Sequence, residues 1–209
     1  MKITNIETIL AGQRYLFVKV HTDTGLVGYG ECGAWCYQEA TAECIHAMEH
    51  HLIGLDPLNI EYINNGLTRC MHFRGSVVMA AISGIDIALW DLKGKYYNAP
   101  IYELLGGKCR DKVRSYEAVF KFTPEEIAQR CVELKEMGFD AARLMITGDI
   151  RLKQAKRRSS VYNAKVSDYI KVVKAVREAV GDEFDMILEC HRSMDPMEAI
   201  AFAKGVEEY

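Results

Sequence analysis

The second half of the chain alternates between strand and helix patterns, and this order restricts the fold more than any other feature. Three strand patterns and three helix patterns occupy, in turn, residues 113–118, 123–137, 141–146, 164–180, 185–189 and 196–208. Strands that alternate with helices are typical of a parallel sheet with right-handed crossovers. The apolar run at residues 186–188 is typical of a strand buried on both faces.

The first half has a different pattern. Residues 3–10, 15–22 and 26–31 alternate in the manner of strands separated by turn residues, which predicts an antiparallel meander. Helical patterns follow over residues 38–51, 57–70 and 76–97. The last is apolar around more than one face, so we expect it to be a buried central helix. A charged segment at residues 108–112 separates the two patterns, so we expect two domains, residues 1–107 and 113–209.

Two patterns that could signal a function also have structural explanations. Gly28-x-Gly30-x-x-Gly33 matches the dinucleotide-binding fingerprint, but these glycines fall in or after a hairpin strand rather than in a βαβ turn. We therefore interpret the match as coincidence. Asp86 and Asp91 lie in the apolar helix pattern, where they are either catalytic or part of a structural ion pair or cap, and we favour the structural role.

Composition narrows the possible partners. A net charge of −3 with 26% charged residues provides no electrostatic footprint for nucleic acid or a membrane surface. The one strongly basic segment, residues 151–158, is interpreted as a solvated loop rather than a binding site. The chain has seven cysteines without a paired spacing and no apolar run of 18 residues, so we expect a protein of the reducing cytoplasm.

Polar residues follow the apolar run at 186–188. Glu189 and His191 are two residues apart, so an extended backbone would point both side chains to the same side. Asp195 and Pro196 then begin a helix pattern. Sites in parallel α/β proteins are built at the carboxyl ends of strands, where the strand-to-helix loops converge. The sequence therefore predicts a site that contains Glu189 and His191.

Two further segments carry a resemblance to a known family. Ala-Leu-Trp-Asp at residues 88–91 ends an alanine-rich run, and Leu-Leu-Gly-Gly-Lys follows at residues 104–108. Together with the preceding meander and helices, they resemble the enolase superfamily. The similarity is to its mandelate racemase/muconate lactonizing enzyme-like members, and closest to the mannonate- and galactonate-dehydratase-like sugar-acid dehydratases. It spans the whole chain.

The resemblance implies an α+β capping domain, made of the meander and helices, followed by an α/β domain. The latter would be the first three βα units of a modified TIM (β/α) barrel, incomplete in this chain. A complete barrel has eight units and typically about 250 residues. We therefore expect this chain to be a fragment, a truncated gene product, or a chain whose remainder is not represented in this sequence.

The resemblance also implies chemistry. Such enzymes bind Mg²⁺ through carboxylates on successive barrel strands and abstract the proton α to a carboxylate, forming an enediolate that the metal neutralises. Glu189 stands at the first ligand position, where family members usually carry the shorter Asp, and His191 stands where the dehydratases place a histidine acid/base. The implied activity is that of a Mg²⁺-dependent sugar-acid (aldonate) dehydratase, a carbon–oxygen lyase.

Other site residues follow from the same resemblance. The second strand lacks the Lys-x-Lys pair of the racemases and has Arg143, which resembles an arginine that supports a tyrosine base. Tyr162 is the candidate base, or else an ordinary loop aromatic. Trp35, His72 and Arg74 in capping-domain loops are candidates for substrate binding, or else surface or interdomain packing residues.

Partners follow from this reading as well. We expect a small sugar acid as substrate, a homo-oligomer, and neither nucleic acid nor membrane as a partner. The alternative hypothesis is a catalytically inactive, truncated relative that acts through binding or assembly.

Overall fold

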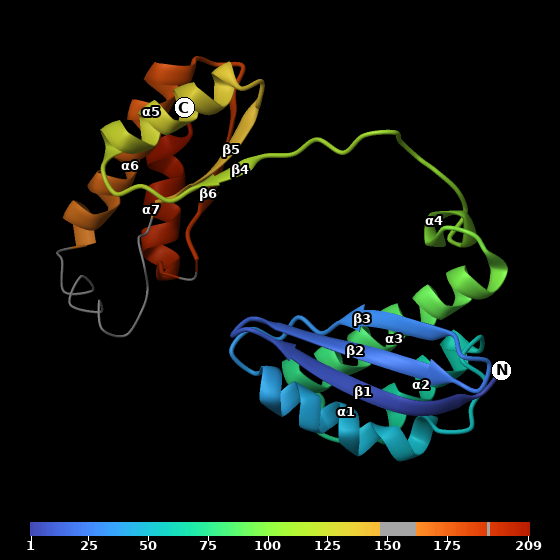
Figure 1. The fold of residues 1–209 in the computed structure, drawn as a ribbon. Helices are drawn as coiled ribbons and strands as arrows, with labels where there is room; N and C mark the ends of the chain where they lie inside the picture. Colours follow the sequence, from blue (N-terminus) through green and yellow to red (C-terminus); the bar gives the residue numbers. More distant parts are fainter. Residues whose placement is uncertain (147–161, 192) are drawn as a thin grey trace. The chain divides into compact units, whose positions relative to one another are not determined.

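The structure is a computed structural model that describes residues 1–146, 162–191 and 193–209. The chain folds as two compact units, Met1–Asp111 and Lys112–Tyr209, each with its own hydrophobic core (Figure 1). The elements of the first unit are β1 (Ile3–Ala11), β2 (Tyr15–Thr22), β3 (Val27–Glu31), α1 (Gln38–Leu52), α2 (Ile60–Cys70), α3 (Ser76–Tyr97) and α4 (Ile101–Leu104). Those of the second are β4 (Glu117–Val119), α5 (Pro124–Glu136), β5 (Ala141–Met145), α6 (Tyr162–Val180), β6 (Asp185–Glu189) and α7 (Pro196–Val206).

The first unit is an antiparallel sheet backed by helices, which confirms the expected meander. The strand order is β1-β2-β3, and α1 and α3 pack on one face of the sheet while α2 packs against α3 (Figure 1). Alternate residues of the central strand, Leu16, Val18 and Val20, are fully buried beneath these helices. The period-2 alternation of the sequence thus separates a core face from an outer face.

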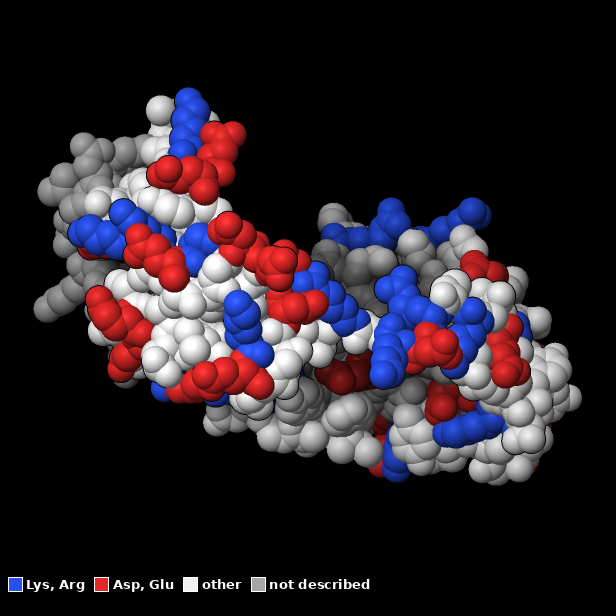
Figure 2. All heavy atoms as spheres, turned by 90° about the horizontal axis from the view of Figure 1, so that it is seen from above, with Lys and Arg blue, Asp and Glu red and all other residues white. Residues whose placement is uncertain are grey.

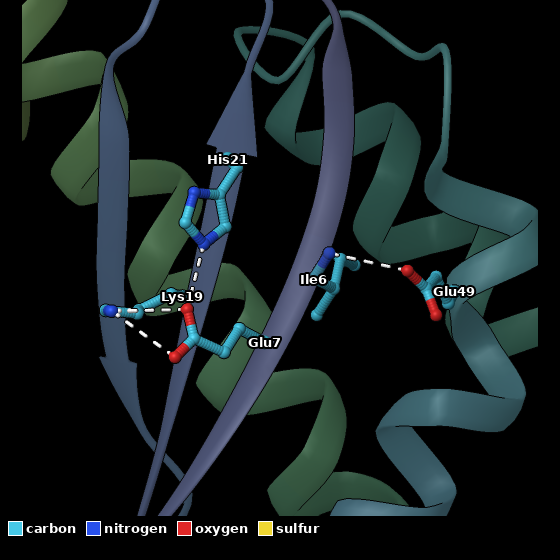
Figure 3. A network of polar contacts seen from close by, with 5 residues as sticks. All are labelled: Ile6, Glu7, Lys19, His21 and Glu49. Carbon is cyan, nitrogen blue, oxygen red and sulfur yellow. Dashed lines mark hydrogen bonds and ion pairs between the residues drawn. The ribbon is translucent and has the colours of Figure 1, made fainter.

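The outer face of this sheet carries a charged network between β1 and β2 (Figure 3). Lys19 Nζ and His21 Nε2 lie 3.2 and 3.1 Å from Glu7 Oε2. Both contacts lower the pKa of the Glu7 carboxyl, and the contact with Lys19 has the larger effect. At the edge of the sheet, the Ile6 amide donates to Glu49 Oε1 of α1 at 3.4 Å.

Two glycines explain how closely β3 approaches α3. A Cβ at Gly28 would lie 2.1 Å from the carbonyl oxygen of Ala88, and one at Gly30 would lie 2.0 Å from that of Gly84. Since these are backbone atoms of α3, a side chain at either glycine would push the strand away from the helix. A Cβ at Gly33 would meet nothing within 4 Å. The apparent nucleotide fingerprint therefore contains a strand-to-helix packing motif.

The second unit is a parallel sheet of order β4-β5-β6, as predicted, with α5, α6 and α7 packed on it (Figure 1). One row of the register contains Val119, Leu144 and Leu188. Val119 and Leu144 are buried in the core beneath these helices, and the partly buried Leu188 packs against it. The neighbouring row contains Arg143 and Ile187, whose side chains point to the opposite face. That face therefore presents the residues of the candidate site.

Two expectations for this unit are wrong. The strand expected to start at Val113 starts at Glu117, and Val113 is exposed. Its partner β5 starts only at Ala141, after the turn at Gly138 that ends α5, so the preceding residues have no neighbouring strand in the described part of the chain. β6 is not buried on both faces, because it is an edge strand with the described helices on one side, and Ile187 is 40% exposed.

The surface has mixed charge. Lys and Arg side chains are interspersed with Asp and Glu over the face shown in Figure 2. No helix in the described part of the chain combines the length and apolar character needed to cross a membrane.

Candidate active site

Two candidate site residues, Glu189 and His191, lie at the carboxyl end of β6, where the chain turns sharply. The sequence analysis assumed an extended backbone at His191. In the structure this residue instead has a left-handed φ of 45°. The turn places the His191 amide 2.8 Å from Glu189 Oε1 and the imidazole Nδ1 3.7 Å from the same oxygen. The amide and hydroxyl of Ser193 both donate to the Cys190 carbonyl, at 3.0 and 2.7 Å, and so close the turn.

The backbone conformation of His191 is energetically unfavourable. A non-glycine residue held with a positive φ costs about 1–3 kcal/mol, and such residues cluster at functional sites. The side chains of His191 and Glu189 are 39% and 29% exposed, so both are accessible to a ligand. A strained turn that presents an imidazole beside a carboxylate is the strongest local sign of a site in this unit.

Arg143 on the neighbouring strand completes a cluster. Its Nη1 lies 3.7 Å from Glu189 Oε2, so the structure brings together three of the predicted site residues: Arg143, Glu189 and His191. The Arg143 Nε is buried and has no hydrogen-bond partner in the described part of the chain. Because a buried donor without an acceptor is costly, this nitrogen is suited to an oxygen atom of an acidic ligand.

The cluster fits a magnesium ion in part. Glu189 provides the hard carboxylate oxygen that Mg²⁺ prefers. Across residues 1–146, 162–191 and 193–209, however, no three His, Cys, Asp or Glu side chains come together as metal ligands. The described residues therefore fit one ligand of such a site.

Tyr162 is the first residue of α6, but its side chain lies outside the described part of the structure, so the candidate base is not placed relative to Arg143. The basic segment at residues 151–158 also lies outside the described residues.

In the first unit, the topology brings three loops to one end. Gly28 lies against Ala88 and Cys32 against Gly84, so β3 runs antiparallel to α3. The segment after β3 and the segment before α3 therefore emerge at the same end. The β1–β2 turn lies at this end as well, because β2 begins beside the end of β3.

The candidate substrate-binding residues lie in these loops. Trp35 is 70% exposed and follows β3, whereas His72 and Arg74 are exposed and precede α3. The guanidinium of Arg14, in the β1–β2 turn, lies 5.5 Å from the centre of the Trp35 ring, which is cation–π distance. Phe73, fully exposed and with φ of 53°, lies between the two candidates. Sequence patterns gave no reason to single out Arg14, since its partner comes from another loop.

Asp86 and Asp91 have structural partners. Asn64 of α2 donates to Asp86 Oδ1 at 2.9 Å. Asp91 Oδ2 accepts from the Tyr29 amide of β3 at 2.9 Å and from Lys95 at 2.6 Å. Both carboxylates thus link α3 to its neighbours, in agreement with the structural interpretation.

Comparison with known proteins gives two successive family matches. The N-terminal domain of mandelate racemase / muconate lactonizing enzyme matches residues 3–106, and the enolase C-terminal domain-like family matches residues 126–209. The chain is 36% identical over 210 residues to D-galactonate dehydratase from Pectobacterium atrosepticum, which covers 100% of this chain and 53% of that protein. The chain therefore spans about half the length of this curated relative.

Solved structures share the fold. A member of the enolase superfamily from Salmonella Typhimurium superposes with a TM-score of 0.88 and 30% identity, covering 99% of this chain and 59% of that one. A dipeptide epimerase from Enterococcus faecalis V583 superposes with a TM-score of 0.80 and 29% sequence identity, covering 100% of this chain and 58% of that one. The two units are therefore a capping domain and part of a barrel. The chain belongs to the mandelate racemase/muconate lactonizing enzyme family of the enolase superfamily, near its sugar-acid dehydratases.

Proposed function

We propose that this chain is part of a dehydratase that acts on a sugar acid of the aldonate class. The reaction removes the proton α to the substrate carboxylate and expels the β-hydroxyl as water through an enediolate. The observation that carries the proposal is the cluster of Arg143, Glu189 and a strained His191 at the carboxyl end of the parallel sheet. The relative named D-galactonate dehydratase supports the substrate class.

Each residue of the cluster has a role in this proposal. Glu189 would be one ligand of a Mg²⁺ ion, which neutralises the developing enediolate when bound. His191 would transfer a proton as acid/base, because its imidazole lies at the rim of the cluster and is accessible. Arg143 would offer its Nε, which has no hydrogen-bond partner among the described residues, to a substrate oxygen or to the phenol of Tyr162 acting as base.

The remaining roles are proposed from the family. Trp35, His72 and Arg74 would contact the distal part of the substrate. The protein would act in the cytoplasm as a homo-oligomer.

The fold alone does not select the reaction, because an epimerase shares it. Residues 143–145 of β5 read Arg-Leu-Met, without the Lys-x-Lys pair of the racemases, which favours elimination. The alternative, an inactive relative that acts by binding, receives no support from the clustered and strained site residues.

The test is turnover of a panel of aldonic acids with Mg²⁺, with the 2-keto acid product and solvent deuterium at the α carbon both measured. We expect product formation, and a loss of about 10²–10⁴-fold on His191→Asn. The matched control His50→Asn changes an exposed imidazole of α1 and should retain activity. Deuterium uptake without loss of water would indicate an epimerase instead. Absence of both for every acid would favour the inactive relative.

A further inference from the structure

Lys165 and Glu198 join α6, α7 and the loop that follows the candidate site. Lys165 Nζ donates to both carboxylate oxygens of Glu198, at 3.1 and 2.9 Å, and to the carbonyl oxygen of Ser193 at 2.9 Å. Glu198 Oε2 in turn accepts from the Asp195 amide at 3.0 Å. The Lys165–Glu198 pair therefore binds two backbone groups of the segment between β6 and α7, the Ser193 carbonyl and the Asp195 amide.

This ion pair is unusually enclosed. The side chains of Lys165 and Glu198 are 16% and 12% exposed, less than those of any other ion pair in the described part of the chain. The hydrogen bond from Lys165, followed by that from the Asp195 amide, lowers the pKa of the Glu198 carboxyl. Exposed pairs contribute little to stability, but removing one member of an enclosed pair leaves the other charge without its partner.

The pair connects to the candidate site through two backbone groups. The Lys165 ammonium donates a hydrogen bond to the Ser193 carbonyl. The amide and hydroxyl of Ser193 in turn donate to the Cys190 carbonyl. Cys190 lies between Glu189 and His191, inside the turn with the left-handed residue. A strained conformation persists only where surrounding contacts fix it, and this series of contacts supplies such a restraint.

We propose that Lys165 and Glu198 form a positioning pair that holds the turn of Glu189 and His191 in its reactive conformation. Neither residue contacts the substrate. The proposal rests on the function proposed above, because it assigns the pair to the same site. Small misplacements of reacting groups can cost about 10²-fold in rate, so loosening this turn should lower kcat more than it changes KM.

The test compares two substitutions of one residue. Lys165→Met keeps the aliphatic stem and removes the charge, whereas Lys165→Arg keeps a cation that can bind both Glu198 and the Ser193 carbonyl. We expect Lys165→Met to lower kcat by about 10–100-fold with KM changed less than about 3-fold. Lys165→Arg should recover most of this loss. The matched control is Lys171→Met on the same helix, whose partner Asp168 lies 3.0 Å away and is exposed; it should behave as wild type.

A second measurement does not need activity. Amide hydrogen exchange should become faster in residues 190–195 of Lys165→Met and stay unchanged in the cores of α5 and β5. If all of α6 and α7 exchange faster and kcat falls only with the folded fraction, the pair is a stability element and the proposal fails. If Lys165→Met does not fold, Glu198→Gln, which keeps an acceptor for the Asp195 amide, is held to the same expectations. Should the wild type show no turnover, selective exchange at 190–195 still supports the restraint, and unchanged exchange refutes it.

Discussion

Gly30→Ala tests the close approach of β3 to α3. The added Cβ would lie 2.0 Å from the Gly84 carbonyl oxygen and 3.0 Å from the Ala88 amide nitrogen. Weak C–H···O contacts are about 3.3 Å or longer, so strand and helix would have to separate by about 1 Å. No rotamer relieves the clash, because both opposing atoms are backbone. Overpacking of this kind costs about 1–3 kcal/mol, and we expect about 3 kcal/mol.

The assay is urea unfolding followed by tryptophan fluorescence. The chain has two tryptophans, Trp35 and Trp90, and both lie in the first unit, so the signal reports on that unit. With a denaturant slope of about 2 kcal/mol/M, the loss corresponds to a midpoint lowered by about 1.5 M. The control is Gly33→Ala, where a Cβ meets nothing within 4 Å and φ is not positive. Its free energy of unfolding should stay within about 0.5 kcal/mol of wild type. Equal midpoints for Gly30→Ala and Gly33→Ala would show that β3 does not contact the α3 backbone in this way.

Two predictions concern the second unit. Thr123→Ala removes the hydroxyl that accepts from the Glu126 amide at 3.2 Å, so the free energy of unfolding of this unit should fall by about 1 kcal/mol in urea; no change would mean that solvent replaces the cap. The Glu198 carboxyl has a pKa below its ordinary value of 4.5, so its contribution to stability is complete above pH 4.5 and is lost as the pH falls through the folded value. Acid unfolding monitored by circular dichroism should therefore be less steep below pH 4.5 for Glu198→Gln, and an identical profile would contradict the assignment.

Several features could be predicted from the sequence because they depend on residues close together in the chain. The sequence predicted a helix over residues 123–137, and in the structure Thr123 and Glu126, one helical turn apart, form the capping box at the start of α5. The alternation of strand and helix predicted the parallel sheet, and the position of Glu189 at the end of an apolar run predicted its place at the end of β6. The predicted start of β4 was wrong, because pairing with a neighbouring strand, rather than the local sequence pattern, decides where a strand begins.

The tertiary structure decided the features that join distant residues. Gly28 and Gly30 match a nucleotide fingerprint in sequence, and only the packing of α3 shows that they permit contact between backbones. Likewise, Arg143 meets Glu189 across neighbouring strands, and Lys165 meets Glu198 across two helices. Residue types and periodicity fix local conformation and which face is apolar. Which distant side chains meet depends on strand register and helix packing, and these exist only once the chain has folded.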